Sequence, residues 1–164
     1  MTAVKDIKVL LVDDEETLIE YVSKRLLREG FTVLAASSGE EAIAIAEAED
    51  FDTAIVDLKM PGMDGIETLE RLKEVRPFLQ CIVLTGYPSI DTAIESERMN
   101  VLSYLHKPAE HEVLMEEVQK AAAKKREIQR GEFLSELQKV ITSQNSPLSI
   151  KREVDLLRRK YGMD

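Results

Sequence analysis

The sequence has few of the residues that stabilise or anchor unusual proteins. Among 164 residues it has one cysteine, Cys81, no tryptophan and only 5% aromatic residues. A single cysteine excludes a disulfide framework within the chain, and no His/Cys spacing typical of a zinc site is present. No apolar run approaches the length of a membrane span, and no basic stretch followed by an apolar one opens the sequence. We therefore expect a soluble, cytoplasmic protein with no membrane contact.

Charge is distributed unevenly along the chain, whose net charge is −9. Residues 1–118 carry 11 Lys+Arg against 25 Asp+Glu, a net of −14, whereas residues 119–164 carry 11 against 6, a net of +5. An acidic body with a basic tail predicts two parts with different partners. The length suits one domain with a full core and an appendage.

Five short apolar runs alternate with helical patterns. Runs rich in Val, Ile and Leu are typical of strands buried on both faces of a parallel sheet. Alternation at this spacing predicts a three-layer α/β domain with right-handed crossovers. The expected strands are 9–12, 31–35, 54–56, 81–84 and 101–105, and the expected helices cover 16–28, 90–99 and the segments that begin at Ser38 and Asp64. Ser38 and Glu41 have the spacing of a capping box.

Polar residues follow four of these runs. They are Asp13, Asp14, Asp57, Thr85 and Lys107. Because ligands bind outside the carboxyl ends of the strands in such sheets, we expect three carboxylates, a hydroxyl and an ammonium at one edge. Each residue alone has a simpler interpretation as a helix cap, a turn residue or an exposed lysine. Their joint occurrence favours a functional site.

The segments around these residues resemble the receiver domain of two-component response regulators, most closely those of the NtrC type. The resemblance covers residues 5–122 and rests on LLVDDEE ending at Glu16, DLKMPGMDG (57–65), LTGYPSIDTAI (84–94) and YLHKP (104–108). It implies a doubly wound, five-stranded parallel sheet in the flavodoxin-like order 2-1-3-4-5. Residues 123–164 would then form a C-terminal α-helical tail.

The resemblance also implies a role for each site residue. Asp57 would accept a phosphoryl group from a sensor histidine kinase or a phosphotransfer protein. Asp14 and Asp57 would bind Mg²⁺ directly, Asp13 would bind it through a water, and the main-chain carbonyl of Lys59 would complete the protein ligands. Mg²⁺ suits such a set because it prefers oxygen ligands and keeps several waters.

Further roles concern the phosphoryl group and the switch. Lys107 and Thr85 would contact phosphoryl oxygens, and Thr85 with Tyr104 would form the switch pair, although Tyr104 also fits a core aromatic on a strand. Lys59 and Tyr87 flank the path of attacking water in the family. Since neither side chain suits the positioning of water, we expect slow self-dephosphorylation.

An enzymatic alternative is a phosphatase with an aspartate nucleophile. Such enzymes need a second acidic residue two positions after the nucleophile, where this chain has Lys59. With no general acid for an external leaving group, we expect no enzyme beyond a protein that catalyses its own phosphorylation and dephosphorylation.

The tail has a less specific pattern. A helix beginning at Glu110 is expected to break or bend at Gly131, and Ser146 with Pro147 predicts the start of a last helix. Apolar stripes on the two tail helices favour a homodimer or a docking hairpin for a protein partner. Basic residues leave a small DNA-binding regulator as the alternative, without a third supporting helix. The stripes are Phe133, Leu137 and Val140, then Ile150, Val154, Leu157 and Tyr161; the basic residues are Lys151, Arg152, Arg158, Arg159 and Lys160.

Overall fold

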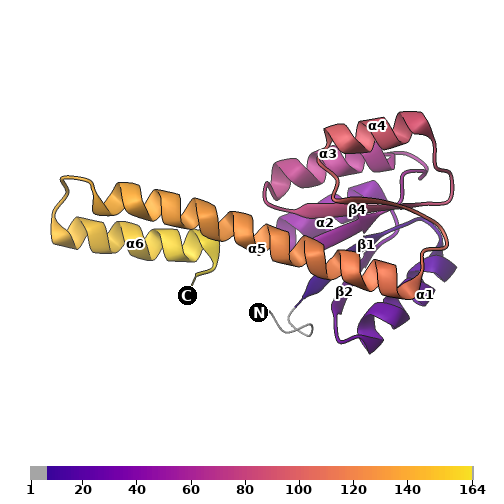
Figure 1. The fold of residues 1–164 in the computed structure, drawn as a ribbon, viewed down its shortest axis with the longest axis horizontal. Coiled ribbons are helices and arrows are strands. Elements are labelled where there is room, and N and C mark those ends of the chain that lie inside the picture. The colour runs from indigo at the N-terminus through magenta and orange to yellow at the C-terminus, as the bar shows by residue number, and fades with distance from the viewer. Residues whose placement is uncertain (1–6, 164) are drawn as a thin grey trace. The chain divides into compact units, whose positions relative to one another are not determined.

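A computed structural model of the chain describes residues 7–163, in which a parallel sheet lies between layers of helices (Figure 1). The five strands are hydrogen-bonded in the order β2-β1-β3-β4-β5, and every pair is parallel. This confirms the predicted flavodoxin-like sheet. The elements are β1 (Lys8–Val12), α1 (Glu16–Arg28), β2 (Thr32–Ala36), α2 (Gly39–Ala48), β3 (Thr53–Val56), α3 (Gly65–Val75), β4 (Gln80–Thr85), α4 (Ile90–Arg98), β5 (Ser103–His106), α5 (His111–Ile141) and α6 (Pro147–Tyr161).

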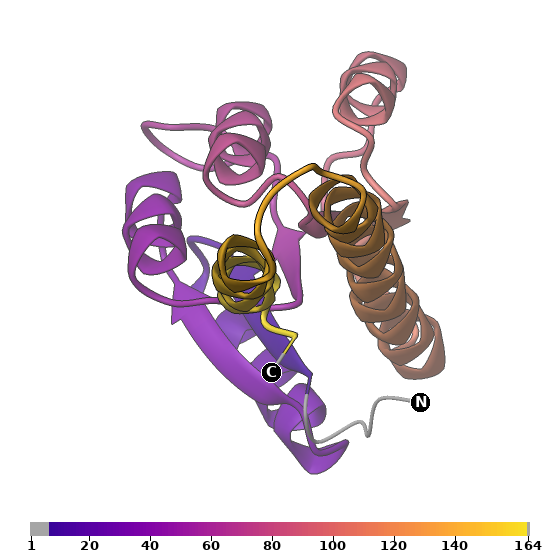
Figure 2. The ribbon, with the colours of Figure 1, turned by 90° about the vertical axis from the view of Figure 1, so that its left-hand side faces the viewer.

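The sheet separates two hydrophobic cores. Successive side chains of a strand point to opposite faces, so each strand contributes to both cores. In β1, Val9 and Leu11 pack with residues of α1 and α5, whereas Leu10 and Val12 pack with residues of α2 and α3. Figure 2 shows helices on both faces of the sheet. Burial on both faces explains why the strands are continuous apolar runs.

Local signals in the sequence set most helix ends. Ser38, Asp64 and Ser146 are N-caps whose side chains accept hydrogen bonds from main-chain N–H groups. The capping box differs from the prediction, because the Glu41 carboxylate accepts hydrogen bonds from the N–H and hydroxyl of Ser37 rather than from Ser38. These two bonds hold the pKa of Glu41 below its usual value.

The predicted break at Gly131 is wrong, because α5 continues through it to Ile141. Glycine inside a helix costs only about 1 kcal/mol relative to alanine, and good helix formers on both sides can offset that cost. A Cβ atom at Gly131 would meet nothing within 4 Å among the described residues.

The chain divides into two compact units between Lys125 and Arg126. Lys125 ends the first unit and is buried, with 4% of its surface exposed. Its Nζ donates to the carbonyl oxygen of Phe51 at 2.6 Å and to Asp50 Oδ1 at 3.1 Å. These bonds fix α5 to the segment that precedes β3.

The second unit is a hairpin formed by the end of α5 and by α6 (Figure 1). The α6 helix begins after Ser146 with Pro147 in its first turn and ends at Gly162, whose φ of 63° is left-handed. The start after Ser146 is the predicted one. Among the described residues, no helix is long and apolar enough to cross a membrane.

Candidate functional site

Three carboxylates meet where β1 and β3 end. Asp13 and Asp57 are buried, with 2% and 4% exposure, while Asp14 is exposed. One oxygen from each lies within 4.8 Å of the others. The pairing of β1 with β3 places them there, since the N–H of Asp57 donates to the Val12 carbonyl at 2.9 Å. Oxygen ligands in this number fit a hard divalent cation such as Mg²⁺, which binds through a few carboxylates and keeps waters.

Lys107 supplies the positive charge of the site. It follows β5, and its Nζ donates to Asp13 Oδ2 at 2.6 Å and lies 3.5 Å from Asp57 Oδ2. Glu15, which the sequence analysis did not single out, contributes an oxygen at 3.8 Å from the same Nζ. Its place in the sequence, directly after Asp13 and Asp14, was the one signal that could have indicated that Glu15 lies at the site.

The charges of the site act on one another. Burial first, and then the negative charge of Asp13, raise the pKa of Asp57 above its usual value, although Lys107 opposes them. Burial alone would lower the pKa of Lys107, but the hydrogen bond and charge of Asp13, with the charges of Asp57 and Glu15, outweigh it and raise that pKa. The site therefore holds more negative charge than Lys107 neutralises, which is the condition that a bound cation would relieve.

Thr85 ends β4 beside Lys107. Its side chain is fully buried, its carbonyl accepts the N–H of Lys107 at 2.8 Å, and its hydroxyl accepts the N–H of Tyr87 at 3.1 Å. On the other side of the site, the N–H of Lys59 donates to Asp57 Oδ1 at 3.4 Å. The Lys59 ammonium lies 4.6 Å from the centre of the Tyr87 ring, a cation–π contact between the two loops.

Tyr104 on β5 is half-buried and packs against the core on the α2–α3 face. Its hydroxyl shares a hydrogen bond of 2.8 Å with Thr92 Oγ1 and accepts the N–H of Ser89 at 3.3 Å. Ser89 is the N-cap of α4, so Tyr104 is bonded to the first turn of that helix. These partners were not predicted from the sequence, although Ser89 and Thr92 have the spacing of a helix cap.

Close packing fixes the segment that carries Asp57. A Cβ atom on Gly65 would lie 2.2 Å from the Asp57 carbonyl oxygen and 2.4 Å from Leu58 Cα. The N–H of Gly65 also donates to the Leu58 carbonyl at 3.0 Å. Only glycine lets α3 begin this close to the end of β3.

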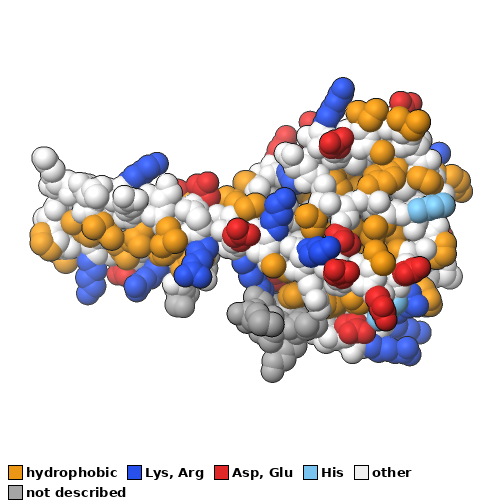
Figure 3. Space-filling model, viewed as in Figure 1, with side chains coloured by type: hydrophobic (Ala, Val, Ile, Leu, Met, Phe, Trp, Pro, Cys, Tyr) orange, Lys and Arg blue, Asp and Glu red, His pale blue; other side chains and the backbone are white. Residues whose placement is uncertain are grey.

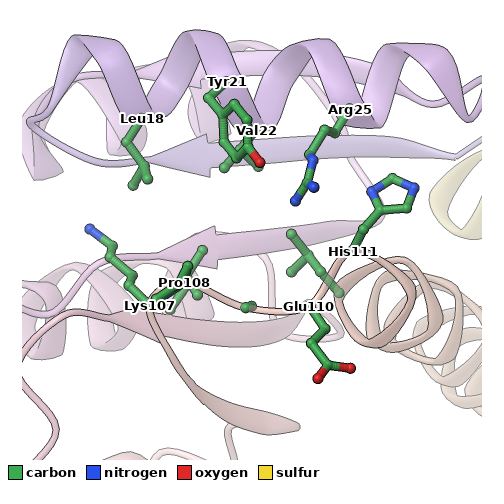
Figure 4. A pocket seen from close by; sticks show the side chains of 11 residues that line it. Leu18, Tyr21, Val22, Arg25, Lys107, Pro108, Glu110 and His111 are labelled. Carbon is green, nitrogen blue, oxygen red and sulfur yellow. The ribbon is translucent and has the colours of Figure 1, made fainter.

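Two cavities adjoin the site. One of about 280 Å³ lies between α1 and the start of α5, lined by Tyr21, Arg25, Lys107 and His111 among others. Figure 4 shows Arg25 reaching from α1 towards the segment that carries Lys107 and His111. The other, of about 540 Å³, includes Lys59 and Tyr87 in its lining. Cys81 is buried in β4, and burial raises the pKa of its thiol to about 12.

Comparison with known families agrees with this geometry. The model of the response regulator receiver domain matches residues 9–119. The chain belongs to this family. Its motifs had predicted that membership, and the acidic cluster, Thr85 and Lys107 all lie within the matched segment.

Several relatives are longer than this chain. It is 35% identical over 121 residues to the transcriptional regulatory protein ZraR of Salmonella typhimurium, which covers 74% of this chain and 27% of that protein. It is 38% identical over 105 residues to the photosynthetic apparatus regulatory protein RegA of Cereibacter sphaeroides, covering 64% of this chain and 57% of that protein. The chain thus spans between a quarter and three fifths of these relatives' lengths.

Solved structures share the fold. A CheY-like receiver domain from Methanospirillum hungatei has a TM-score of 0.71 and 30% identity, covering 74% of this chain and 97% of that one. A response regulator from Burkholderia pseudomallei, with a phosphorylated aspartic acid, a calcium ion and citrate, has a TM-score of 0.67 and 29% identity. That match covers 92% of this chain and 93% of the other, so it extends beyond the receiver domain.

Proposed function

We propose that this chain is a cytoplasmic phosphoacceptor switch of a two-component phosphorelay. Its receiver domain would cover residues 5–122 and its helical extension residues 123–164. A sensor histidine kinase or a phosphotransfer protein would donate the phosphoryl group to Asp57. The observation that carries the proposal is the cluster of three carboxylates, two of them buried, with the Lys107 ammonium 3.5 Å from Asp57.

In the transfer step, an oxygen of the Asp57 carboxylate forms a bond to phosphorus while the phosphorus–nitrogen bond of a phosphohistidine breaks. The product is an acyl phosphate, and the histidine leaves with the electron pair. Asp13, Asp14, Asp57 and the carbonyl of Lys59 would hold Mg²⁺, which neutralises carboxylates and phosphoryl oxygens when bound. The protein would turn over no external phosphate ester.

Lys107 and Thr85 would stabilise the transferred group. Lys107 is already held near Asp57 by its bond to Asp13, so it can bind a phosphoryl oxygen with little movement. Thr85 would give up its bond with the Tyr87 N–H and donate its hydroxyl proton to another oxygen. Such contacts stabilise charge on the equatorial oxygens, where most of the catalysis of phosphoryl transfer arises.

The conformational change that signals phosphorylation to a protein partner would involve Thr85 and Tyr104. A move of Thr85 towards the phosphoryl group changes the space beside β5, and Tyr104 would respond by leaving its bonds to Thr92 and Ser89. Because these bonds reach the first turn of α4, their loss would alter the α4 surface that a protein partner reads. Thr85 and Tyr104 would thus have two arrangements, one with and one without the bonds to α4. Phosphorylation would shift the equilibrium between them only by the difference in its contact energy with each arrangement.

The donor protein would dock over the cavity between α1 and α5, because that cavity reaches Lys107 (Figure 4). Replacing Arg25 with alanine should therefore slow transfer from a phosphorylated histidine protein. It should leave the reaction with acetyl phosphate unchanged, since a small donor needs no protein contact. Equal slowing with both donors would contradict this docking position.

We also propose that the helical extension makes the protein a homodimer. A small DNA-binding regulator is the second candidate, supported by the basic tail and by relatives named as transcriptional regulators. A gel shift with duplex DNA at several salt concentrations separates the two. Affinity that falls steeply with salt would favour DNA binding, because contacts with phosphates release counterions.

The function itself is tested with Mg²⁺ and acetyl phosphate. The protein should gain one phosphoryl group, seen by intact mass, and the gain should vanish with a chelator or in Asp57→Asn. Asp155→Asn, which changes an exposed carboxylate of α6, is the matched control and should label like wild type. Full labelling of Asp57→Asn at the wild-type rate would refute the proposal.

A further inference from the structure

Glu15 occupies a position that usually caps a helix, but its side chain caps nothing. It is the N-cap residue of α1, and its carboxylate accepts no hydrogen bond from the first turn of that helix, which lies wholly within the described residues. Short polar side chains suit an N-cap because they reach the unpaired N–H groups of the first turn. The N-caps of α2, α3, α4 and α6 each accept such a bond; they are Ser38, Asp64, Ser89 and Ser146. Helix α1 therefore lacks a stabilising bond that these four helices have.

The Glu15 carboxylate lies beside Lys107 instead. Its Oε1 is 3.8 Å from Lys107 Nζ, and 60% of the Glu15 side chain is exposed. The N–H of Glu15 donates to Asp13 Oδ1 at 2.9 Å, which fixes the start of its side chain next to the site. Figure 3 shows Asp and Glu side chains scattered over the surface of the first compact unit, where they face solvent. Because an acidic side chain of this unit can be solvated so easily, the contact of Glu15 with the ammonium points to a role in the site.

Three carboxylates surround the Lys107 ammonium, and Glu15 differs from the other two. An ammonium has three N–H donors. Its other acidic neighbours are Asp13 at 2.6 Å and Asp57 at 3.5 Å, both of which belong to the proposed cation site. Among the described residues, the Glu15 carboxylate has no hydrogen bond or ion pair apart from the one with Lys107. Glu15 can therefore keep its contact with Lys107 when the two aspartates bind the cation.

We infer that Glu15 is a positioning residue for phosphoryl transfer, which holds the Lys107 ammonium beside Asp57 while the aspartates bind the cation. The inference rests on the proposed function and adds a residue to it. It predicts that one substitution changes stability and activity in opposite directions. Glu15→Asp keeps the charge but shortens the side chain by one methylene, and an aspartate at this position can cap α1. The melting temperature should therefore rise, while Lys107 loses one of its three acceptors.

Two measurements on the full chain test this inference. The maximal rate of labelling by acetyl phosphate at saturating Mg²⁺ should fall by about two- to fivefold in Glu15→Asp, the range that an exposed ion pair can supply. The Mg²⁺ concentration that gives half of this rate should stay the same, because the charge near the cation is unchanged. Glu16→Asp, the same substitution at the next residue, which is also exposed, is the matched control and should keep the wild-type rate.

The second measurement needs neither cation nor phosphodonor. Lysines of the metal-free protein are acetylated with a trace of acetic anhydride, and peptide mass spectrometry gives the relative reactivity of each amine. Lys107 should react faster in Glu15→Asp than in wild type, because its ammonium is held less firmly. The exposed Lys151 should react equally in both proteins.

Four results would overturn the inference. They are a wild-type rate in Glu15→Asp, a lower rate with unchanged Lys107 reactivity, a melting temperature that falls together with the rate, and a changed half-saturating Mg²⁺ concentration with an unchanged maximal rate. The last would assign Glu15 to the cation site instead of to Lys107. A wild type that gains no phosphoryl group would refute the proposed function, whereas the acetylation experiment tests the contact of Glu15 with Lys107 separately.

Discussion

Replacing Gly65 with alanine should destabilise the protein through a single methyl group. The new Cβ would lie 2.2 Å from the Asp57 carbonyl oxygen and 2.4 Å from Leu58 Cα, whereas non-bonded carbon contacts are optimal at about 3.5–4.0 Å. Both neighbours are main-chain atoms, and Gly65 is bonded to this segment through the Leu58 carbonyl. Neither can rotate away, so α3 or the end of β3 must shift by more than about 1 Å.

The expected decrease in the free energy of unfolding follows from these contacts. Overpacking typically costs about 1–3 kcal/mol, and a clash with main chain belongs at the upper end of that range. The better helix propensity of alanine returns up to about 1 kcal/mol, which leaves a net loss of roughly 2–3 kcal/mol. Because the displaced segment carries Asp57, phosphorylation by acetyl phosphate should also become slower.

Urea unfolding followed by circular dichroism measures the effect. Gly131→Ala is the matched control, because its Cβ would meet nothing within 4 Å and it lies inside α5. That change should stabilise the helix by about 0.5–1 kcal/mol. If Gly65→Ala unfolded within about 0.5 kcal/mol of wild type, a value usual for surface substitutions, the proposed close packing of α3 on the Asp57 segment would be wrong.

Three further predictions concern other parts of the chain. Tyr87→Ala should shorten the lifetime of the phosphorylated protein, measured by loss of label, because it would open the proposed path of attacking water; an unchanged half-life would contradict this. Lys125→Met should cost about 1–3 kcal/mol in urea unfolding, since it leaves the Phe51 carbonyl without its donor at 2.6 Å; no loss would show that this bond contributes nothing. Hydrogen bonds from Lys160 and Tyr161 lower the pKa of Glu136. The folding stability that these bonds contribute is fully present above a pH of about 4.3, the unfolded-state pKa of a glutamate, and is lost as pH falls through the lowered folded-state pKa. The melting temperature of Glu136→Gln should therefore lack the part of the fall at acid pH that these bonds cause in wild type. Identical dependence of the two melting temperatures on pH would refute this prediction.

The sequence predicted the architecture because strong patterns specify it. Val9 to Val12 is apolar throughout since both faces of β1 are buried, and the same holds for β3 and β4. The ends of parallel strands share one edge, so the order of the motifs was enough to bring Asp13, Asp57 and Lys107 together. Caps at Ser38, Asp64 and Ser146 followed from local spacing.

Which side chains form hydrogen bonds or ion pairs with one another was harder to predict from the sequence. The pairing of Lys107 with Asp13 rather than with Asp57 depends on distances that differ by less than an ångström. The bonds of Tyr104 depend on where α4 begins relative to β5. Gly131 was misjudged because its cost of about 1 kcal/mol is small beside the helix propensity of its neighbours.

The central claim is that Asp57 is the residue that carries the phosphoryl group. Borohydride reduction of the protein treated with Mg²⁺ and acetyl phosphate converts an aspartyl phosphate to homoserine, which peptide mass spectrometry can locate. The proposal predicts homoserine at position 57 alone, and none when the phosphodonor is omitted. Homoserine at Asp13 or Asp14 with an intact Asp57, or no conversion in a protein that carries label, would contradict it.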